Sequence, residues 1–138
     1  RELKDNFHDI IVSTGATYDE EIILASKILH DTNFSFLHCI TIYPTPLEKL
    51  NLSRIEWLEK FSKNVGFSDH TLVKENDIKA SKIALACGAK IIERHFTILE
   101  EDKTKDGPVS INQEKLSEIV EFSKLQHKDQ MNEINNNE

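Results

Sequence analysis

The sequence is short of the residues that mark several protein classes. Its two cysteines, Cys39 and Cys87, lie in apolar segments and lack a paired spacing, so a disulfide scaffold is not expected and a reducing compartment is. No apolar run approaches the roughly 18 residues of a membrane span. No basic segment followed by an apolar one opens the chain. The sequence therefore predicts a cytoplasmic protein that does not contact a membrane.

Positive charge is also scarce. The chain has 17 Lys and Arg residues against 24 Asp and Glu residues, which gives a net charge of -7. Its basic residues are scattered along the chain, so no nucleic-acid partner is expected. With only 4 glycines, it also lacks a glycine-rich phosphate loop. An anionic substrate would need positive charge from a metal ion or from helix N-termini.

What the chain does have is a regular alternation of short apolar runs and amphipathic segments. Its 138 residues are enough for one domain. Strands are expected at Asp9–Val12, Phe34–Cys39, Val65–Asp69 and Ala89–Arg94. A first helix is expected to begin at the capping sequence Thr17–Glu20 and a second at Ser53. A third is expected over Asp77–Cys87, ending before Gly88. The last helix is expected to turn four residues inward: Leu116, Ile119, Val120 and Ser123.

Four successive strand and helix units predict parallel strands joined by right-handed crossovers. Such strands can form either a small open sheet with helices on both faces or half of a (β/α)₈ barrel. The half barrel is favoured, because a complete barrel needs about 250 residues and places its chemistry at the C-terminal ends of the strands. It would leave two apolar sheet edges unpaired. We assign residues 1–125 to this half barrel and expect the polar tail, residues 126–138, to fray.

Two histidines lie at the expected ends of neighbouring strands. His70 follows the third strand and His95 follows the fourth. A single histidine is more often a hydrogen-bonded structural residue than a metal ligand. Two imidazoles at adjacent strand ends reverse that preference, because neutral imidazoles suit first-row metal ions.

The alternation of side chains along a strand separates two groups of residues near these histidines. Ser68 lies two residues before His70, so both face the same side of the sheet. Glu93 stands in the same relation to His95. By the same alternation, the residues between them, Asp69 and Arg94, are expected to face the helix layer.

Several motifs occur in a fixed order along nearly the whole chain. They are Ser13-Thr14-Gly15, Leu37-His38-Cys39, Tyr43-Pro44-Thr45-Pro46, the sequence GFSDHTL over residues 66–72 and ERHFT over residues 93–97. This ordered set resembles one known family, the N-acetylneuraminate (sialic acid) synthases and their nonulosonate synthase relatives. The resemblance implies strands five to eight of a (β/α)₈ barrel. It also implies an enzyme that condenses phosphoenolpyruvate with an N-acetylmannosamine-type aldehyde and releases phosphate.

The resemblance also implies roles for individual residues. His70 and His95 match the family's metal ligands and would act in catalysis, with manganese as the expected ion and magnesium or another first-row metal as the alternative. Ser13 and Ser68 match positions that contact the phosphate of phosphoenolpyruvate, although either could be a turn-forming or capping serine.

The sugar site departs from the family pattern in two places. Tyr43 matches a residue that lines the sugar pocket. Thr41 stands where relatives often carry Asn or Ser, so it could donate one hydrogen bond with a shorter reach. Relatives commonly have an acid directly after the last Gly-Pro, where this chain has Val109; Asp106 is expected to replace it, or the sugar differs.

Two other functions are open at the level of sequence. The chain could be a non-catalytic half barrel that binds a phosphate compound or another chain. It could also be a metal-dependent hydrolase on a similar barrel, although such enzymes usually gather three or more protein ligands. His38 and Cys39 are interpreted as structural, since no acid stands beside them to orient the histidine. As partners we expect the two substrates and either a second copy of the chain or an N-terminal barrel half.

Overall fold

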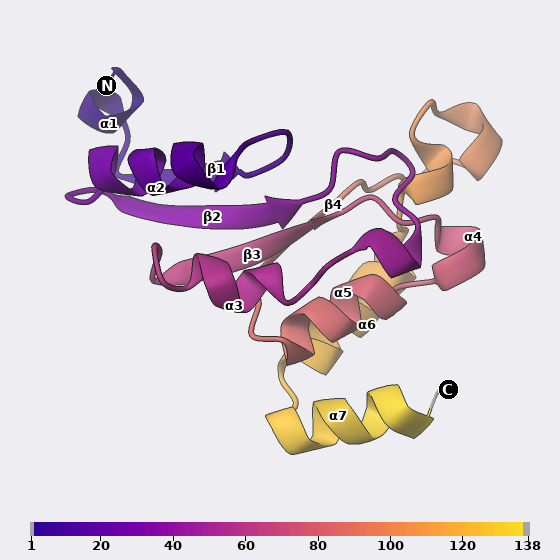
Figure 1. The fold of residues 1–138 in the computed structure, drawn as a ribbon. Helices are drawn as coiled ribbons and strands as arrows, with labels where there is room; N and C mark the ends of the chain where they lie inside the picture. The colour runs from indigo at the N-terminus through magenta and orange to yellow at the C-terminus, as the bar shows by residue number, and fades with distance from the viewer. Residues whose placement is uncertain (1, 137–138) are drawn as a thin grey trace.

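The computed structural model describes residues 2–136, and its centre is a four-stranded parallel sheet (Figure 1). The strands are, in spatial and sequence order, β1 (Asp9–Ser13), β2 (Asn33–Cys39), β3 (Asn64–Asp69) and β4 (Ile91–Arg94). Each strand pairs in parallel with the next. Consecutive parallel strands joined by helices are the repeating unit of a (β/α)₈ barrel, so the half-barrel fold expected from the sequence is confirmed.

Helices connect the strands and continue the chain beyond β4. The α-helices are α1 (Glu2–Asn6), α2 (Asp19–Ile28), α3 (Arg54–Leu58), α4 (Val73–Asn76), α5 (Lys79–Ala86), α6 (Gln113–Ser123) and α7 (His127–Asn136). Three 3₁₀ turns lie in the loops after β2 and β4: η1 (Leu47–Lys49), η2 (Glu101–Lys103) and η3 (Gly107–Val109). The capping interaction of α2 lies one residue later than predicted, because Glu21 accepts a hydrogen bond from the backbone N–H of Tyr18 at 2.8 Å.

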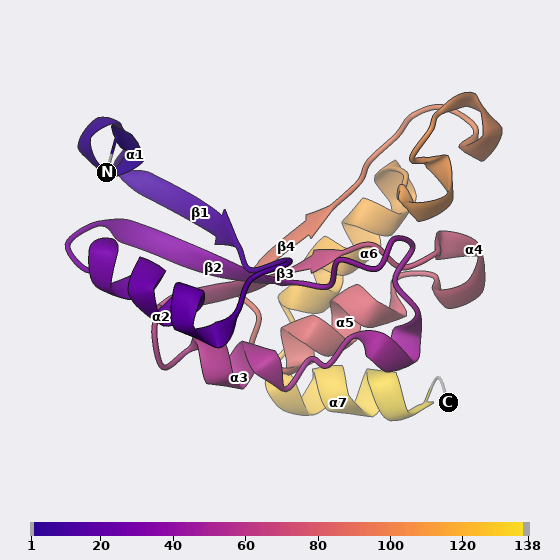
Figure 2. The same cartoon turned by 45° about the horizontal axis from the view of Figure 1, so that its top comes forward.

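One face of the sheet packs against helices and forms the main core. Phe36, Val65 and Phe67 point to this face, and each is at most 1% exposed. They cluster with apolar residues of α2, α3 and α5, namely Ile22, Ile55, Leu58, Ala80 and Ala84. Figure 2 shows these helices and α7 on the same side of the sheet. Burial of each large side chain contributes about 1.5–3 kcal/mol, which fixes the orientation of every strand.

The opposite face of the sheet is the one that a closed barrel would turn inward. Ile11 on this face of β1 is 57% exposed. β1 and β4 are the edge strands of the sheet. In a closed barrel both edges would pair with further strands, and the inward face would be filled by their side chains.

The helix predicted over residues 77–87 is present as α5, which begins at Lys79. Asp77 has a φ of 49°, which separates α5 from the short helix α4 that precedes it. The backbone carbonyl of Asp77 accepts a hydrogen bond from the Arg94 guanidinium at 3.4 Å. Gly88, with a φ of 98°, follows α5 at the place predicted for the terminating glycine.

The inward face of α6 also differs from the prediction. Ile119 and Phe122 are buried, whereas Leu116 and Val120 are each 44% exposed and Ser123 is also exposed. These three line a cavity of about 330 Å³ beside the free edge of β4. The helical periodicity was correct, but the side that Leu116 and Val120 face lacks a neighbouring strand in the described part of the chain.

The prediction of a frayed tail is wrong for residues 127–136, which form α7. This helix packs against α5, and Gln130 is only 8% exposed. Its side-chain amide donates to the Phe122 carbonyl at 3.2 Å, and Glu133 pairs with Lys82 of α5 at 2.7 Å. A polar sequence can hold a helix in place through such contacts. Residues 137 and 138 lie outside the described residues.

No helix within residues 2–136 has both the length and the apolar composition required to cross a membrane.

Candidate functional site at the C-terminal ends of the strands

Three aromatic rings meet where β3 and β4 end. His70 directly follows β3 and His95 directly follows β4, and their ring centroids lie 5.5 Å apart. Tyr43, from the loop after β2, lies 5.3 Å from the His70 ring and 5.9 Å from the His95 ring. The structure thus brings together the two histidines singled out in the sequence, with a tyrosine from a third unit beside them.

Backbone hydrogen bonds tie both histidines to the loops of the site. The carbonyl of His70 accepts from the backbone N–H of Thr45 at 2.9 Å. The carbonyl of His95 accepts from the backbone N–H of Ile111 at 2.8 Å. The loops after β2 and β4 are therefore attached to the strand ends that carry the imidazoles.

Tyr43 and Asp106 form a contact between two loops that are far apart in the sequence. The Tyr43 hydroxyl donates a hydrogen bond to Oδ1 of Asp106 at 2.6 Å. Both side chains were predicted to contact the sugar, and their contact places them on one side of the imidazole pair. A phenol and a carboxylate together can bind the hydroxyl groups of a sugar.

Burial and neighbouring charges change the acidity of two groups in the site. The pKa of His70 is lowered by burial and by the nearby His95, which outweigh the opposite effect of Asp69 and Glu93. A lowered pKa keeps the His70 imidazole neutral, which is the form that binds metals. The pKa of Tyr43 is raised to about 12 by desolvation and by the hydrogen bond and charge of Asp106, so its hydroxyl remains a donor.

Ser68 lies on the barrel-interior face, where its hydroxyl is already hydrogen-bonded to a neighbouring side chain. It is 3% exposed, and its hydroxyl donates to Oε1 of Glu93 at 2.6 Å. The shared face predicted for these two side chains is confirmed. Glu93 was not among the predicted site residues, although its two-residue spacing from His95 indicated that it would border the site.

Ser13 lies a strand away from the histidines, whereas Thr41 follows Ile40, whose backbone carbonyl accepts a hydrogen bond from the His70 ring. Ser13 pairs in register with Leu37, which pairs with Gly66, so β2 lies between Ser13 and the strand that carries Ser68. Two strand spacings correspond to about 10 Å. Thr41 lines a cavity of about 790 Å³ beside the start of α2. Their proposed substrate contacts stay predictions.

Directly behind the histidines lies a buried ion pair between Asp69 and Arg94. Asp69 also accepts a hydrogen bond from Ser81 of α5 at 2.6 Å, which confirms that it faces the helix layer. The sequence predicted the direction of both side chains but not that they would meet. Their matching positions in the sequence could have indicated this contact, because each residue directly precedes a histidine at the end of a neighbouring strand.

His38 has a structural environment. It is 1% exposed on the helix-facing side of β2, and its Nε2 donates to the carbonyl of Leu50 at 2.7 Å. Burial lowers its pKa, so the imidazole is neutral. Cys39 points to the other face and has a weak contact with the Ile40 carbonyl at 3.8 Å.

The two imidazoles form a partial ligand set for one metal ion. Among residues 2–136, no group of three or more His, Cys, Asp or Glu side chains is arranged to hold a metal. Metal to imidazole nitrogen distances are about 2 Å, so rings with centroids 5.5 Å apart can both reach one ion. His70 and His95 therefore fit a metal whose remaining positions are filled by water, substrate or another part of the barrel.

Comparison with protein families and known proteins identifies one family. The model of the NeuB family matches residues 1–134. An uncharacterized protein of Methanocaldococcus jannaschii is 40% identical over 126 residues, which cover 86% of this chain and 35% of that protein. N,N'-diacetyllegionaminic acid synthase of Campylobacter jejuni is 40% identical over 105 residues, covering 72% of this chain and 29% of the enzyme.

Solved structures agree with these sequence matches. The chain superimposes on N-acetylneuraminic acid (sialic acid) synthetase of Leptospira borgpetersenii with a TM-score of 0.74 and 31% identity, covering 82% of this chain and 39% of that one. It also superimposes on the spore coat polysaccharide biosynthesis protein SpsE of Bacillus subtilis with a TM-score of 0.71 and 29% identity, covering 92% and 35%.

Each match covers most of this chain but only a minor part of the relative. The chain spans about a third of the length of the curated relatives it matches, with 35%, 32% and 29% for three of them. The family model nevertheless covers almost every residue of the chain, and the motifs around both histidines lie within the match. The chain therefore belongs to the NeuB family, the family of the sialic acid and related nonulosonate synthases.

Proposed function

We propose that this chain forms the C-terminal half of the barrel of a nonulosonate synthase. That enzyme would condense phosphoenolpyruvate with an amino-sugar aldehyde and release phosphate. The observation that carries the proposal is the group of Tyr43, His70, His95 and Asp106 at one end of a half barrel that belongs to this family.

His70 and His95 would hold a divalent metal ion, with manganese as the first candidate. The ion would supply a positive charge that polarises the aldehyde oxygen of the sugar. Neutral imidazoles are required for this role, and the lowered pKa of His70 supports it. The net charge of -7 makes such a local positive charge necessary for an anionic substrate.

The other side chains would bind and orient the substrates. The Tyr43 hydroxyl and the Asp106 carboxylate would contact hydroxyl groups of the sugar. The hydroxyls of Ser13 and Ser68 would donate hydrogen bonds to phosphate oxygens, for which Ser68 must release Glu93. Binding both substrates side by side accounts for much of the expected rate, because it converts a bimolecular reaction into a unimolecular one.

The bonds change in a defined order. The C3 carbon of phosphoenolpyruvate forms a bond to the aldehyde carbon, and the aldehyde oxygen takes a proton. Water adds to the positively charged C2 carbon and loses a proton. The C2–O bond to phosphate then breaks, which releases inorganic phosphate and leaves the keto acid.

The experiment measures phosphate release by a reconstituted barrel, meaning this chain combined with or fused to an N-terminal half barrel. N-acetylmannosamine is the first acceptor. Further acceptors are the aldehydes that remain when the three carbons of phosphoenolpyruvate are removed from the acids named for the relatives. We expect phosphate release with at least one of them, and none from the chain by itself.

Two variants distinguish the chemistry from the fold. His95→Ala should abolish turnover, because one of the two metal-binding imidazoles is lost. Cys39→Ala is the control: it should leave turnover largely intact and lower the free energy of unfolding by about 1 kcal/mol. A fully active His95→Ala barrel would refute the metal role, and turnover by the chain alone would refute the need for a second half.

A hydrolase is the less favoured alternative. Metal-dependent hydrolases usually gather three or more protein ligands, whereas the described residues contain no group of three potential ligands.

A further inference from the structure

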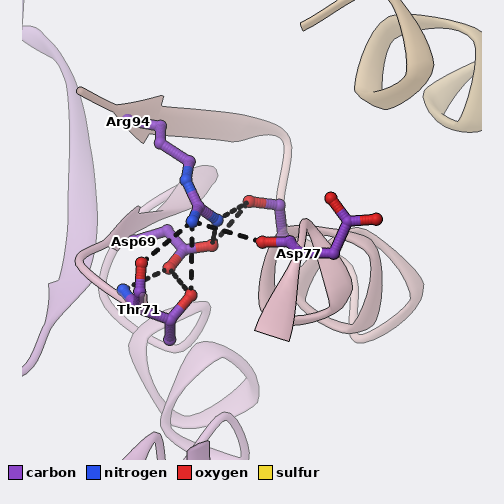
Figure 3. Close-up of polar contacts among 5 residues, drawn as sticks. Asp69, Thr71, Asp77 and Arg94 are labelled. Carbon is purple, nitrogen blue, oxygen red and sulfur yellow. Dashed lines mark hydrogen bonds and ion pairs between the residues drawn. The ribbon is translucent and has the colours of Figure 1, made fainter. Parts of the chain in front are cut away.

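A buried ion pair joins Asp69 to Arg94 (Figure 3), and each of the two residues directly precedes a histidine of the site. Asp69 and Arg94 are the last residues of β3 and β4 and are partners in the sheet register. Their side chains are 0% and 2% exposed. We propose that they are positioning residues that fix the spacing and orientation of the His70 and His95 imidazoles. This inference rests on the proposed function, in which those imidazoles bind a metal ion.

The guanidinium of Arg94 connects β4 to several points of the neighbouring unit. Its Nη1 donates to the Asp69 carboxylate and, at 3.3 Å, to the Ser81 hydroxyl. Its Nη2 donates to the backbone carbonyls of Thr71 at 3.0 Å and Asp77 at 3.4 Å. Because the guanidinium is planar and rigid, these bonds fix its position in more than one direction.

The carboxylate of Asp69 holds the chain on both sides of His70. Its Oδ1 accepts from the backbone N–H of Thr71 at 2.9 Å and from the Thr71 hydroxyl at 2.8 Å. Its Oδ2 accepts from the Ser81 hydroxyl at 2.6 Å. The residues before and after His70 are therefore fixed by one carboxylate, which restricts the backbone dihedrals of His70 itself.

Because side chains alternate along a strand, residues held on the helix-facing side also fix the position of the residues that follow them on the other side. Asp69 and Arg94 point to the helix layer, so the residues that follow them point toward the barrel interior. A shift or rotation of either strand end would move one imidazole relative to the other. The cross-strand bond between Asp69 and Arg94 opposes that movement at the residue before each histidine.

Stability alone does not account for this pair. Buried ion pairs often stabilise a fold no more than apolar side chains of the same volume, because both charges lose their hydration. The Arg94 Nε is also buried with no hydrogen-bond partner in the described part of the chain. What an ion pair provides beyond apolar packing is a directional connection between two strands.

The test uses a variant that cuts the cross-strand connection but leaves no unpaired charge. In Asp69→Asn/Arg94→Met, the Asn amide can still accept from Thr71 and bond with Ser81, whereas no side-chain donor remains at position 94 of β4. Lys82→Met is the matched control, since it removes an ion pair between α5 and α7. Both are made in the reconstituted barrel, with only this chain carrying ¹⁵N-labelled histidine. The chain has 6 histidines, so the spectra are simple.

Two measurements separate the inference from the proposed function. The first is the backbone order parameter of His70 and His95 without metal. We expect it to fall in Asp69→Asn/Arg94→Met, from about 0.85 toward 0.6, and to stay unchanged in Lys82→Met. The second is the Mn²⁺ dissociation constant, which should rise roughly tenfold in the double variant with little change in melting temperature.

The outcomes are distinct. Unchanged order parameters of both histidines in the double variant would overturn the positioning role. If wild type binds Mn²⁺, equal affinity in the double variant would also overturn it. If wild type binds no Mn²⁺ while the order parameters change as expected, the positioning inference stands and the metal role under the proposed function fails.

Discussion

At the scale of single residues, the site depends on the ionisation state of a few side chains. Burial and the proximity of His95 lower the pKa of His70, so this imidazole is neutral at pH 7. The pKa of Tyr43 is shifted in the other direction: it is raised to about 12, which keeps the phenol protonated beside Asp106. One side chain is prepared to accept a metal ion and the other to donate a hydrogen bond.

The first prediction concerns metal binding. His70→Ala in the reconstituted barrel should raise the Mn²⁺ dissociation constant at least roughly tenfold, because one of two ligands is lost. In wild type the affinity should weaken as the pH falls below about 6.5, where protons compete for the imidazoles. The lowered pKa of His70 shifts this loss toward lower pH.

Calorimetric titration over a series of pH values checks both parts. His30→Ala is the control, because the His30 side chain is 73% exposed on the surface. Equal Mn²⁺ affinity in wild type and His70→Ala would contradict the prediction.

The second prediction concerns His38 and stability. Its pKa is lowered in the folded state by burial, so the unfolded chain takes up a proton first as the pH falls. Stability from this residue is present above its unfolded pKa of about 6.5 and is lost as the pH falls through the lower folded value. In urea unfolding of the reconstituted barrel, the free energy of unfolding should therefore decrease less between neutral and mildly acidic pH in His38→Gln than in wild type. The same pH dependence in both proteins would show that His38 is not the source.

At the scale of elements, β3 packs closely between its two neighbouring strands, β2 and β4. Gly66 lies between Leu37 of β2 and Ile91 of β4. A Cβ atom at Gly66 would lie 2.5 Å from the Ile91 carbonyl oxygen and 2.5 Å from Cδ2 of Leu37. The absence of a side chain at this position allows the three strands to pack at this register.

The third prediction follows from this contact. Gly66→Ala should lower the free energy of unfolding by about 1–3 kcal/mol, because the backbone of β4 must move to avoid the overlap. The small gain from a less flexible unfolded chain does not offset that cost. Gly15→Ala should cost less, since its Cβ would meet a side-chain atom of Thr41 at 3.1 Å. Chemical denaturation of both variants tests the order, and equal losses would contradict it.

The elements also show where local sequence signals stop being informative. The strands and the register of polar and apolar positions followed from periodicity, because one face of each strand is buried against helices. The short helix α4 before Asp77 did not follow, because the turn that ends it coincides with a contact between the Asp77 carbonyl and Arg94 from another unit. The helix α7 was missed for the same reason: its polar residues are ordered by contacts with α5 and Phe122.

At the scale of the whole molecule, the half barrel has two free sheet edges and an apolar cavity beside one of them. β1 and β4 are the edges, and Leu116 and Val120 of α6 line the cavity next to β4. Unpaired strands offer a row of backbone donors and acceptors to any other chain. The surface thus fits a complementary half barrel.

The fourth prediction is that the chain by itself does not remain a stable monomer. It should dimerise, aggregate or require an N-terminal half, because both edges and the inward face are open. Light scattering and a thermal melt test this directly, with the reconstituted barrel as the control. A compact monomer that melts cooperatively would mean that the open edges are tolerated.

The sequence by itself determined the fold family, the parallel order of the strands and the faces of the sheet to which Ser68, Asp69, Glu93 and Arg94 point. These depend on periodicity and on motifs, which are local properties. It also indicated that His70 and His95 would be neighbours, since the carboxyl ends of adjacent parallel strands meet at one edge.

Only the tertiary structure decided which side chains touch. The bond from Tyr43 to Asp106 joins residues 63 positions apart, and the pair of Asp69 with Arg94 joins residues 25 positions apart. It also placed β2 between Ser13 and the strand that His70 follows, although the resemblance implied a phosphate contact for Ser13. The physical reason is that such contacts depend on the register and curvature of strands and on the path of long loops. These are fixed by packing of the whole chain and not by any segment of it.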